Sequence, residues 1–236
     1  MHTFRRLSVL SVAVLSGALV VVPSLSAQAA GAPSAKSLLA AAKTALAAEN
    51  GVHIVVTTLE AKIKSSVVAD IGNTSGTETY NSGTEKFTIS VTPTVAYMSG
   101  SKKGLTTIMG LSSTQQQKVG TATVVMKKGT SPYTSLHSNL TANAYAQLLP
   151  TLAETKLLRT RDKSTHGYKL TWTTKATSTT PKSVTVMVVS SGAKALPISE
   201  SVTSSSGTSR TTFTHWGEKV VVKKPAKTIA YSTVFG

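Results

Sequence analysis

The chain has 236 residues, no cysteine and a formal net charge of +16. The lack of cysteine excludes disulfides, thiolate metal ligands, a thiol nucleophile and attachment of an acyl chain to cysteine. A chain of this length can bury a real core, and one β-rich domain is the default organisation.

The first thirty residues follow the order of a secretory signal peptide. Two arginines precede an apolar run over residues 7–22, and the small-residue sequence Ala27-Gln28-Ala29 follows. The run is about 16 residues long, shorter than the roughly 20 residues that a membrane-spanning helix needs. We expect cleavage of residues 1–29, without lipidation, and a single domain over residues 30–236 that is secreted or held in the cell envelope. A retained N-terminal anchor is the alternative.

Residues 34–50 form the one long segment whose apolar residues recur at helical spacing. Ser34 is placed to cap the start of this helix, and Asn50-Gly51 to end it with a left-handed residue. A β pattern follows, in which β-branched or alternating segments are separated by Asn, Ser and Gly turns. These features predict successive antiparallel strands over residues 52–59, 65–71, 77–81, 87–91 and 95–98.

Two helical stretches then interrupt the strands. The first predicts one or two short helices over residues 102–119, ended by Gly110 and Gly120; the second contains one turn at Tyr133 and a short helix that runs to Pro150. Further strands are predicted over residues 121–126, 155–159, 167–174, 183–189, 197–204, 208–216 and 219–222. The fold class is therefore α+β, predominantly β: a curved antiparallel sheet with helices against one face.

The apolar face of such a sheet either packs fully with side chains or leaves a cavity for a ligand. The aromatic content is only 5% and many inward positions are Ala, Ser, Thr or Val. Small side chains on a wide sheet are compatible with unfilled volume, and equally with a threonine-rich core. Composition leaves the two possibilities open.

The sequence contains no diagnostic catalytic motif. His53, His137, His166 and His215 lie in four separate segments without the paired spacing of a zinc or copper site. His215 ends a strand beside Trp216 and could face a pocket mouth, but packing of the ring on an aromatic neighbour explains it better. We expect no enzyme activity, no metal and no cofactor.

Several features occur in a specific order: the helix before Gly51, the strand end at residues 97–101 leading into residues 105–111, and the helical insert over residues 133–149. The last feature is the C-terminal part of the chain, where Leu196-Pro-Ile-Ser-Glu200 precedes Phe213-Thr-His-Trp-Gly217 and residues 220–225. This order resembles the LolA-like group of exported lipid and lipoprotein carriers, particularly the LppX and LprG type. Many of those relatives have an acylated lipobox cysteine, where this chain has Ala29, Ala30 and Gly31.

The resemblance implies an incomplete or half barrel whose concave apolar face, covered by helices, encloses acyl chains. It also implies an exported, non-catalytic carrier or binding protein for a lipid, a lipidated molecule or another apolar ligand. Burial of an acyl chain supplies roughly 0.8 kcal/mol per methylene. By alternation we expect the concave side of the sheet and its covering helices to present Val56, Phe87, Ile89, Val91, Tyr97, Leu170, Trp172, Val186 and Val188, with Ile108, Met109, Leu148 and Leu149 on the helices.

The basic charge favours a second function. Lysine doublets at residues 102–103, 127–128 and 223–224 lie near the ends of predicted elements. They could contact an anionic membrane surface, an acidic envelope polymer or a protein partner, or they could be solvated. A filled core with binding through this basic surface is the alternative to lipid binding. Nucleic acid is not expected as a partner outside the cytoplasm, and we expect a monomer.

Overall fold

The computed structural model describes residues 33–142, 146, 158–177, 181–192 and 194–236. The expected signal peptide, the end of the second helical insert and the predicted site residues Leu148 and Leu149 lie outside these ranges. Over the described ranges, every helix is too short or too polar to cross a membrane.

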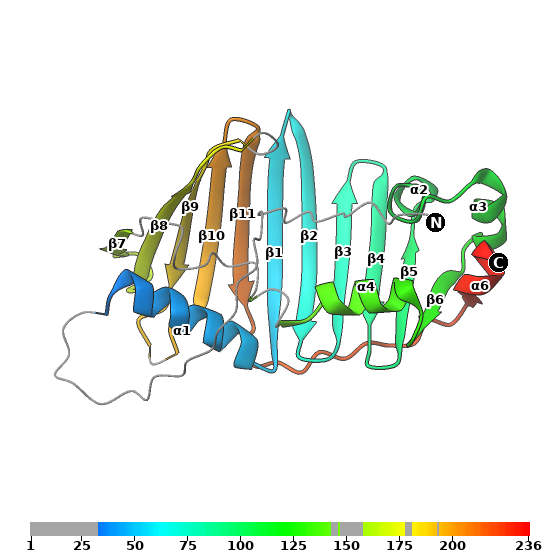
Figure 1. Ribbon diagram of the computed structural model, residues 1–236, viewed down its shortest axis with the longest axis horizontal. Coiled ribbons are helices and arrows are strands. Elements are labelled where there is room, and N and C mark those ends of the chain that lie inside the picture. The colour runs from blue at the N-terminus through cyan, green and yellow to red at the C-terminus, as the bar shows by residue number, and fades with distance from the viewer. Residues whose placement is uncertain (1–32, 143–145, 147–157, 178–180, 193) are drawn as a thin grey trace.

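The described strands form one open, curved sheet, shown in Figure 1. Twelve strands follow the order β12-β6-β5-β4-β3-β2-β1-β11-β10-β9-β8-β7, and every neighbouring pair is antiparallel except β12 and β6. The expected fold class is confirmed. The strands are β1 Gly51–Glu60, β2 Ile63–Gly72, β3 Gly76–Ser82, β4 Glu85–Val91, β5 Val95–Gly100, β6 Thr123–Lys127, β7 Leu158–Arg161, β8 Tyr168–Thr174, β9 Ser183–Val189, β10 Pro197–Ser204, β11 Gly207–Thr214 and β12 Thr228–Ala230.

Helices lie against one face of this sheet. Figure 1 shows α1 across the β8–β11 side, while α4 packs on β4 to β6 and α2 on β4 and β5. Their buried residues, such as Leu39 of α1, Met109 of α2 and Tyr133 of α4, join the same core cluster as the strands. The described helices are α1 Ala35–Ala48, α2 Lys102–Met109, α3 Ser113–Val119, α4 Ser131–Asn139 and α6 Tyr231–Phe235.

The two faces of the sheet differ in composition. On β4, Phe87, Ile89 and Val91 are buried on the face that carries the helices, and Thr88 and Ser90 between them lie on the other face. Residues directly opposite each other in an antiparallel ladder share a face, so the strand register assigns every neighbouring residue to one side. We call the two sides the helix-covered face and the outer face.

The ends of the elements include one confirmed cap and two wrong predictions. The Ser34 side chain accepts a hydrogen bond from the Ser37 amide, as expected of the N-cap of α1. The helix ends at Glu49 in an extended conformation, however, because the chain turns directly into β1 at Gly51. The segment expected as a strand over residues 219–222 forms no ladder, since its Val220 packs beside Gly51 and Gly72 instead.

Candidate functional site

Most of the predicted ligand-lining residues lie on the helix-covered face. Six of them are on strands, two are on α2, and each is at most 7% exposed. They pack in one cluster whose members come from both ends of the sheet order. Their contact with a ligand remains a prediction. These residues are Val56, Phe87, Ile89, Val91, Leu170 and Trp172 on the strands, and Ile108 and Met109 on α2.

The predicted placement of Tyr97, Val186 and Val188 is wrong. Tyr97 lies opposite Ser90, and Val188 lies opposite both Lys169 and Ser199, which are residues of the outer face. Residues 95–98 of β5 and 186–189 of β9 are uninterrupted apolar runs, so alternation within them gives no phase.

The register instead puts two methionines on the helix-covered face, where sequence reasoning missed them. Met98 lies opposite Ile89, Met187 lies opposite Leu170, and both methionine side chains are fully buried. Pairing with an alternating strand was the only signal that could have identified them.

The helix-covered face also contains a carboxylate that the sequence reasoning did not select. Glu200 of β10 lies opposite Met187 on one side and Thr211 on the other. On the next strand beyond Met187 lies Leu170, and on the next strand beyond Thr211 lies Val56. The acid is therefore in the middle of a mainly apolar row of cross-strand neighbours.

Glu200 combines two properties that do not normally occur together. Desolvation by the surrounding protein raises the pKa of its carboxyl from 4.5 to about 7. The side chain nevertheless keeps partial solvent accessibility. It therefore borders space that solvent can enter although protein surrounds it.

The outer face carries a separate polar cluster around the start of β1. His53 Nδ1 lies 2.7 Å from Asp70 Oδ1, and the rings of His53 and His215 meet edge to face with centroids 5.6 Å apart. These residues line a cavity of about 550 Å³ together with Thr77, Ser90 and the segment over residues 218–223.

The hydrogen bonds of this cluster are not those of a nucleophilic triad. Across the sheet His53 lies between Asp70 and Thr214. A hydrolase needs the imidazole hydrogen-bonded to both the acid and the hydroxyl nucleophile. In the part of the chain that the structure describes, the His53 ring is hydrogen-bonded to Asp70 but to no hydroxyl. Among the described residues, no group of three or more histidines and acids could hold a metal ion.

His215 lines this cavity, but its contacts are structural. Its Nδ1 lies 3.1 Å from Thr214 Oγ1, and its backbone φ is 53°. The sequence predicted that His215 packs on Trp216, and this prediction is wrong. Trp216 stacks on Phe213 and donates from Nε1 to the Pro197 carbonyl at 3.2 Å.

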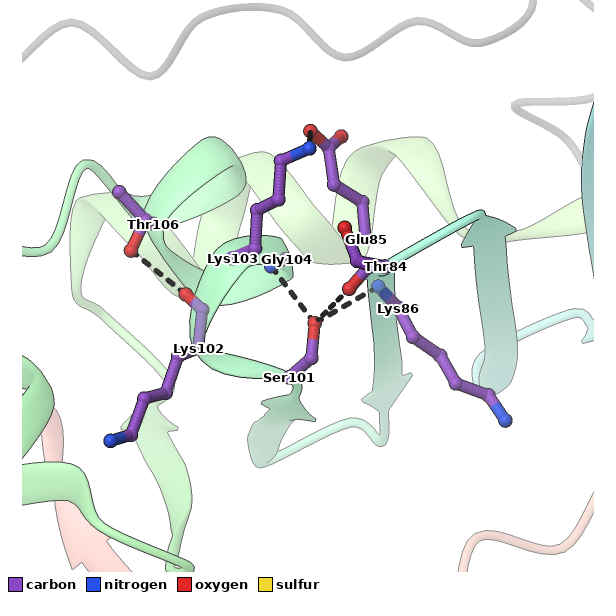
Figure 2. Close-up of polar contacts among 8 residues, drawn as sticks. All are labelled: Thr84, Glu85, Lys86, Ser101, Lys102, Lys103, Gly104 and Thr106. Carbon is purple, nitrogen blue, oxygen red and sulfur yellow. Dashed lines mark hydrogen bonds and ion pairs between the residues drawn. The ribbon is translucent and has the colours of Figure 1, made fainter. Parts of the chain in front are cut away.

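Of the three lysine doublets, the one at the start of α2 takes part in local structure (Figure 2). Ser101 Oγ accepts hydrogen bonds from the Gly104 and Lys86 amides and donates to the Thr84 carbonyl at 2.8 Å. Lys103 Nζ lies 3.3 Å from Glu85 Oε1.

A glycine at position 104 is required because a Cβ there would lie 2.4 Å from the Lys86 carbonyl oxygen. The other two doublets, residues 127–128 and 223–224, are exposed. Residues 101–104 thus fasten α2 to β4, whereas the other doublets are available to a partner.

The fold and site define the class as an open antiparallel half barrel with helices on its apolar face. No protein-family model matches the chain, and no curated protein sequence matches it significantly. Among solved structures, LprF from Mycobacterium bovis is similar at 17% identity, with 83% of this chain and 100% of that chain covered and a TM-score of 0.49. The lipoprotein LppX from Mycobacterium tuberculosis is similar at 15% identity, with 79% and 98% covered and a TM-score of 0.48. An uncharacterized conserved protein from Thermus thermophilus has 8% identity, 83% and 98% coverage and a TM-score of 0.42.

Proposed function

We propose that the protein is a non-catalytic carrier or binding protein for a lipid or another apolar molecule, which it holds against the helix-covered face. The observation that carries this proposal is the partial accessibility of Glu200 in a row whose neighbours Met187 and Thr211 are buried. A filled core leaves no accessible space around an internal carboxyl. The row that contains Glu200 also contains Met187, Leu170 and Val56, and such mainly apolar surroundings favour an apolar occupant.

The energetics of such a site are those of apolar burial. Each methylene removed from water contributes roughly 0.8 kcal/mol, so a long acyl chain can be held without any covalent or catalytic step. We place the protein outside the cytoplasm because of the signal-peptide pattern of residues 1–29. N-terminal sequencing of the exported product tests this placement, with Ala30 expected as the first residue.

Intrinsic fluorescence gives a direct test, since the chain has two tryptophans in different environments. Trp172 is 4% exposed on the helix-covered face, and Trp216 lies beyond the end of β11. In a Trp216→Phe variant, addition of hexadecanol should shift or quench the emission of Trp172. A matched Trp172→Phe variant should respond weakly, which locates the ligand on the predicted face.

Native mass spectrometry of the protein from its own host complements the titration. A stoichiometric apolar molecule, identified after organic extraction, supports the proposal and names the cargo. A protein that is empty, and whose Trp172 emission does not change with added hexadecanol, contradicts it.

The basic surface supports a second candidate function, binding of an anionic envelope polymer. The net charge of +16 and the exposed doublets at residues 127–128 and 223–224 favour it. Retention on vesicles that contain anionic lipid, or on an acidic polysaccharide, should then fall steeply with salt. Salt-insensitive or absent retention counts against this alternative.

A further inference from the structure

Glu200 is isolated from counter-charges on its own face. Among the residues that the structure describes, none gives its carboxyl a hydrogen bond or an ion pair, and its cross-strand neighbours are Met187 and Thr211. A carboxylate without a partner inside a protein carries a desolvation cost that packing alone does not repay. The position therefore suits a carboxyl group whose hydrogen-bond partner is supplied by a bound molecule.

Three of the other ionisable groups on this side do not supply that partner. Arg159 is three strands from Glu200 along the row, roughly 14 Å at ordinary strand spacing, and it bonds to the Pro33 carbonyl. Glu78 lies four strands away in the opposite direction, roughly 19 Å, and has the same charge sign. Lys43 of α1 is half-buried, and desolvation lowers its pKa, but no ion pair joins it to Glu200.

Two buried hydroxyl residues lie beside the carboxyl on the same face. Thr211 is its direct cross-strand neighbour and is 6% exposed, and Thr185, two residues before Met187, is 4% exposed. Thr185, Glu200 and Thr211 form a polar patch, and apolar residues of the same face adjoin it, among them Leu170, Trp172, Met187, Val189 and Phe213.

We infer that Glu200 is the polar anchor of the ligand site, and that it accepts a hydrogen bond from a hydroxyl or amine group of a ligand whose remaining surface is apolar. This inference rests on the proposed carrier function. A neutral or cationic donor satisfies the ionised carboxyl, whereas a ligand carboxylate or phosphate at the same place is repelled by it. The cargo class is thus an apolar molecule with an internal or terminal donor group, such as a long-chain alcohol, and not a free fatty acid.

Competition between two probes that differ in a single donor tests the inference. Hexadecanol and its methyl ether have nearly the same apolar surface, and only the alcohol can donate. Each is used at pH 8 to displace a neutral fluorescent probe, N-phenyl-1-naphthylamine, from the full mature chain. We expect the wild type to prefer the alcohol by about tenfold, the effect of one hydrogen bond to a charged acceptor.

Three variants separate recognition from folding. Glu200→Leu should lose the preference for the alcohol while it still takes up the probe, and Glu200→Gln should keep part of the preference because an amide oxygen still accepts. Ser201→Leu, one residue along β10 on the outer face, is the matched control and should behave as the wild type.

The outcomes distinguish the two proposals. Failure of the wild type to take up the probe overturns the carrier function and the inference with it. Uptake with equal displacement by alcohol and ether overturns the role of Glu200 and leaves the carrier function standing. Loss of the preference in Ser201→Leu as well as in Glu200→Leu also overturns that role, because the effect is then structural.

Discussion

The β4–β6 side of the sheet and the β8–β11 side bury different residues on the same face. On the first side, the buried positions of the three strands are all apolar, and Phe87 stacks on Tyr80 with ring centroids 5.0 Å apart. On the second side, Leu170 and Met187 are interrupted by Thr185, Thr211 and the accessible Glu200. The helix over the second side, α1, also buries small side chains, because its buried residues include two alanines besides its leucines.

This difference suggests that the two sides of the sheet have different roles, one in stability and one in ligand binding. A uniformly apolar, close-packed region supplies stability, whereas polar groups in a core lower it and are kept where they serve a purpose. We expect the β4–β6 side to be the stabilising part, and the proposed function assigns ligand binding to the β8–β11 side. Four predictions test this division, beginning with the largest effect.

The largest effect is expected from Phe87→Ala on the stabilising side. Removal of a side chain that is 1% exposed leaves a cavity in a close-packed region and should lower the free energy of unfolding by about 3–5 kcal/mol. Urea denaturation followed by circular dichroism measures it. Thr88→Ala, the next residue and on the outer face, loses a hydroxyl contact to Thr79 at 3.0 Å and should cost below about 1 kcal/mol. Equal losses would contradict the packing described for β4.

On the β8–β11 side, Glu200 should make stability depend on pH. Its pKa is about 7 in the folded protein against 4.5 as the ordinary value, so between these pH values the folded state holds a proton that the unfolded state has released. The free energy of unfolding should therefore fall as pH rises from 4.5 to 7, by up to about 3 kcal/mol, and level off above. Glu200→Gln should remove this component, which a comparison of urea midpoints at pH 5 and pH 8 detects. An identical pH profile in the two proteins would refute the raised pKa.

A smaller effect is expected where α2 is fastened to β4. Ser101→Ala removes the N-cap and the bonds to the Lys86 amide and the Thr84 carbonyl, so it should cost about 1–2 kcal/mol. Amide hydrogen exchange should accelerate in α2 before it does in the central strands. Ser99→Ala, two residues earlier on the outer face of β5, is the control and should leave the exchange of α2 unchanged.

The smallest effect is expected at the ion pair between Lys103 and Glu85. The lysine side chain is 63% exposed, and an exposed pair contributes at most about 0.5 kcal/mol. Lys103→Ala should change the urea midpoint only slightly, and salt should reduce the difference further. A loss as large as that of Ser101→Ala would mean that the pair, rather than the cap, fastens α2.

Local pattern accounts for the parts of the fold that sequence could predict. On β4 the polar residues Thr88 and Ser90 alternate with three apolar ones, so strand, face and core residues were all assigned correctly. The Ser34 cap and the glycines that end α2 and α3 are equally local signals. Each of these features is determined by residues within a few positions of one another.

The remaining features depend on contacts between distant strands. The apolar run of β9 has no local phase, and only its ladder with β8 puts Met187 rather than Val186 on the helix-covered face. Glu200 gives no local sign of its surroundings, because Met187 and Thr211 reach it from two other strands. The segment over residues 219–222 has the β-branched composition of a strand, yet packing beside Gly51 and Gly72 determines its conformation.

The parallel pairing of β12 with β6 has a consequence for the kinetics of folding. Thr228 lies beside Thr123 only after the chain has completed β11 and returned across the sheet, and such a contact carries a large loop-closure entropy. Until then the free edge of β6 can accept a strand from another molecule. Self-association should therefore compete with refolding at high protein concentration, whereas the completed molecule presents at this end only the three-residue strand β12.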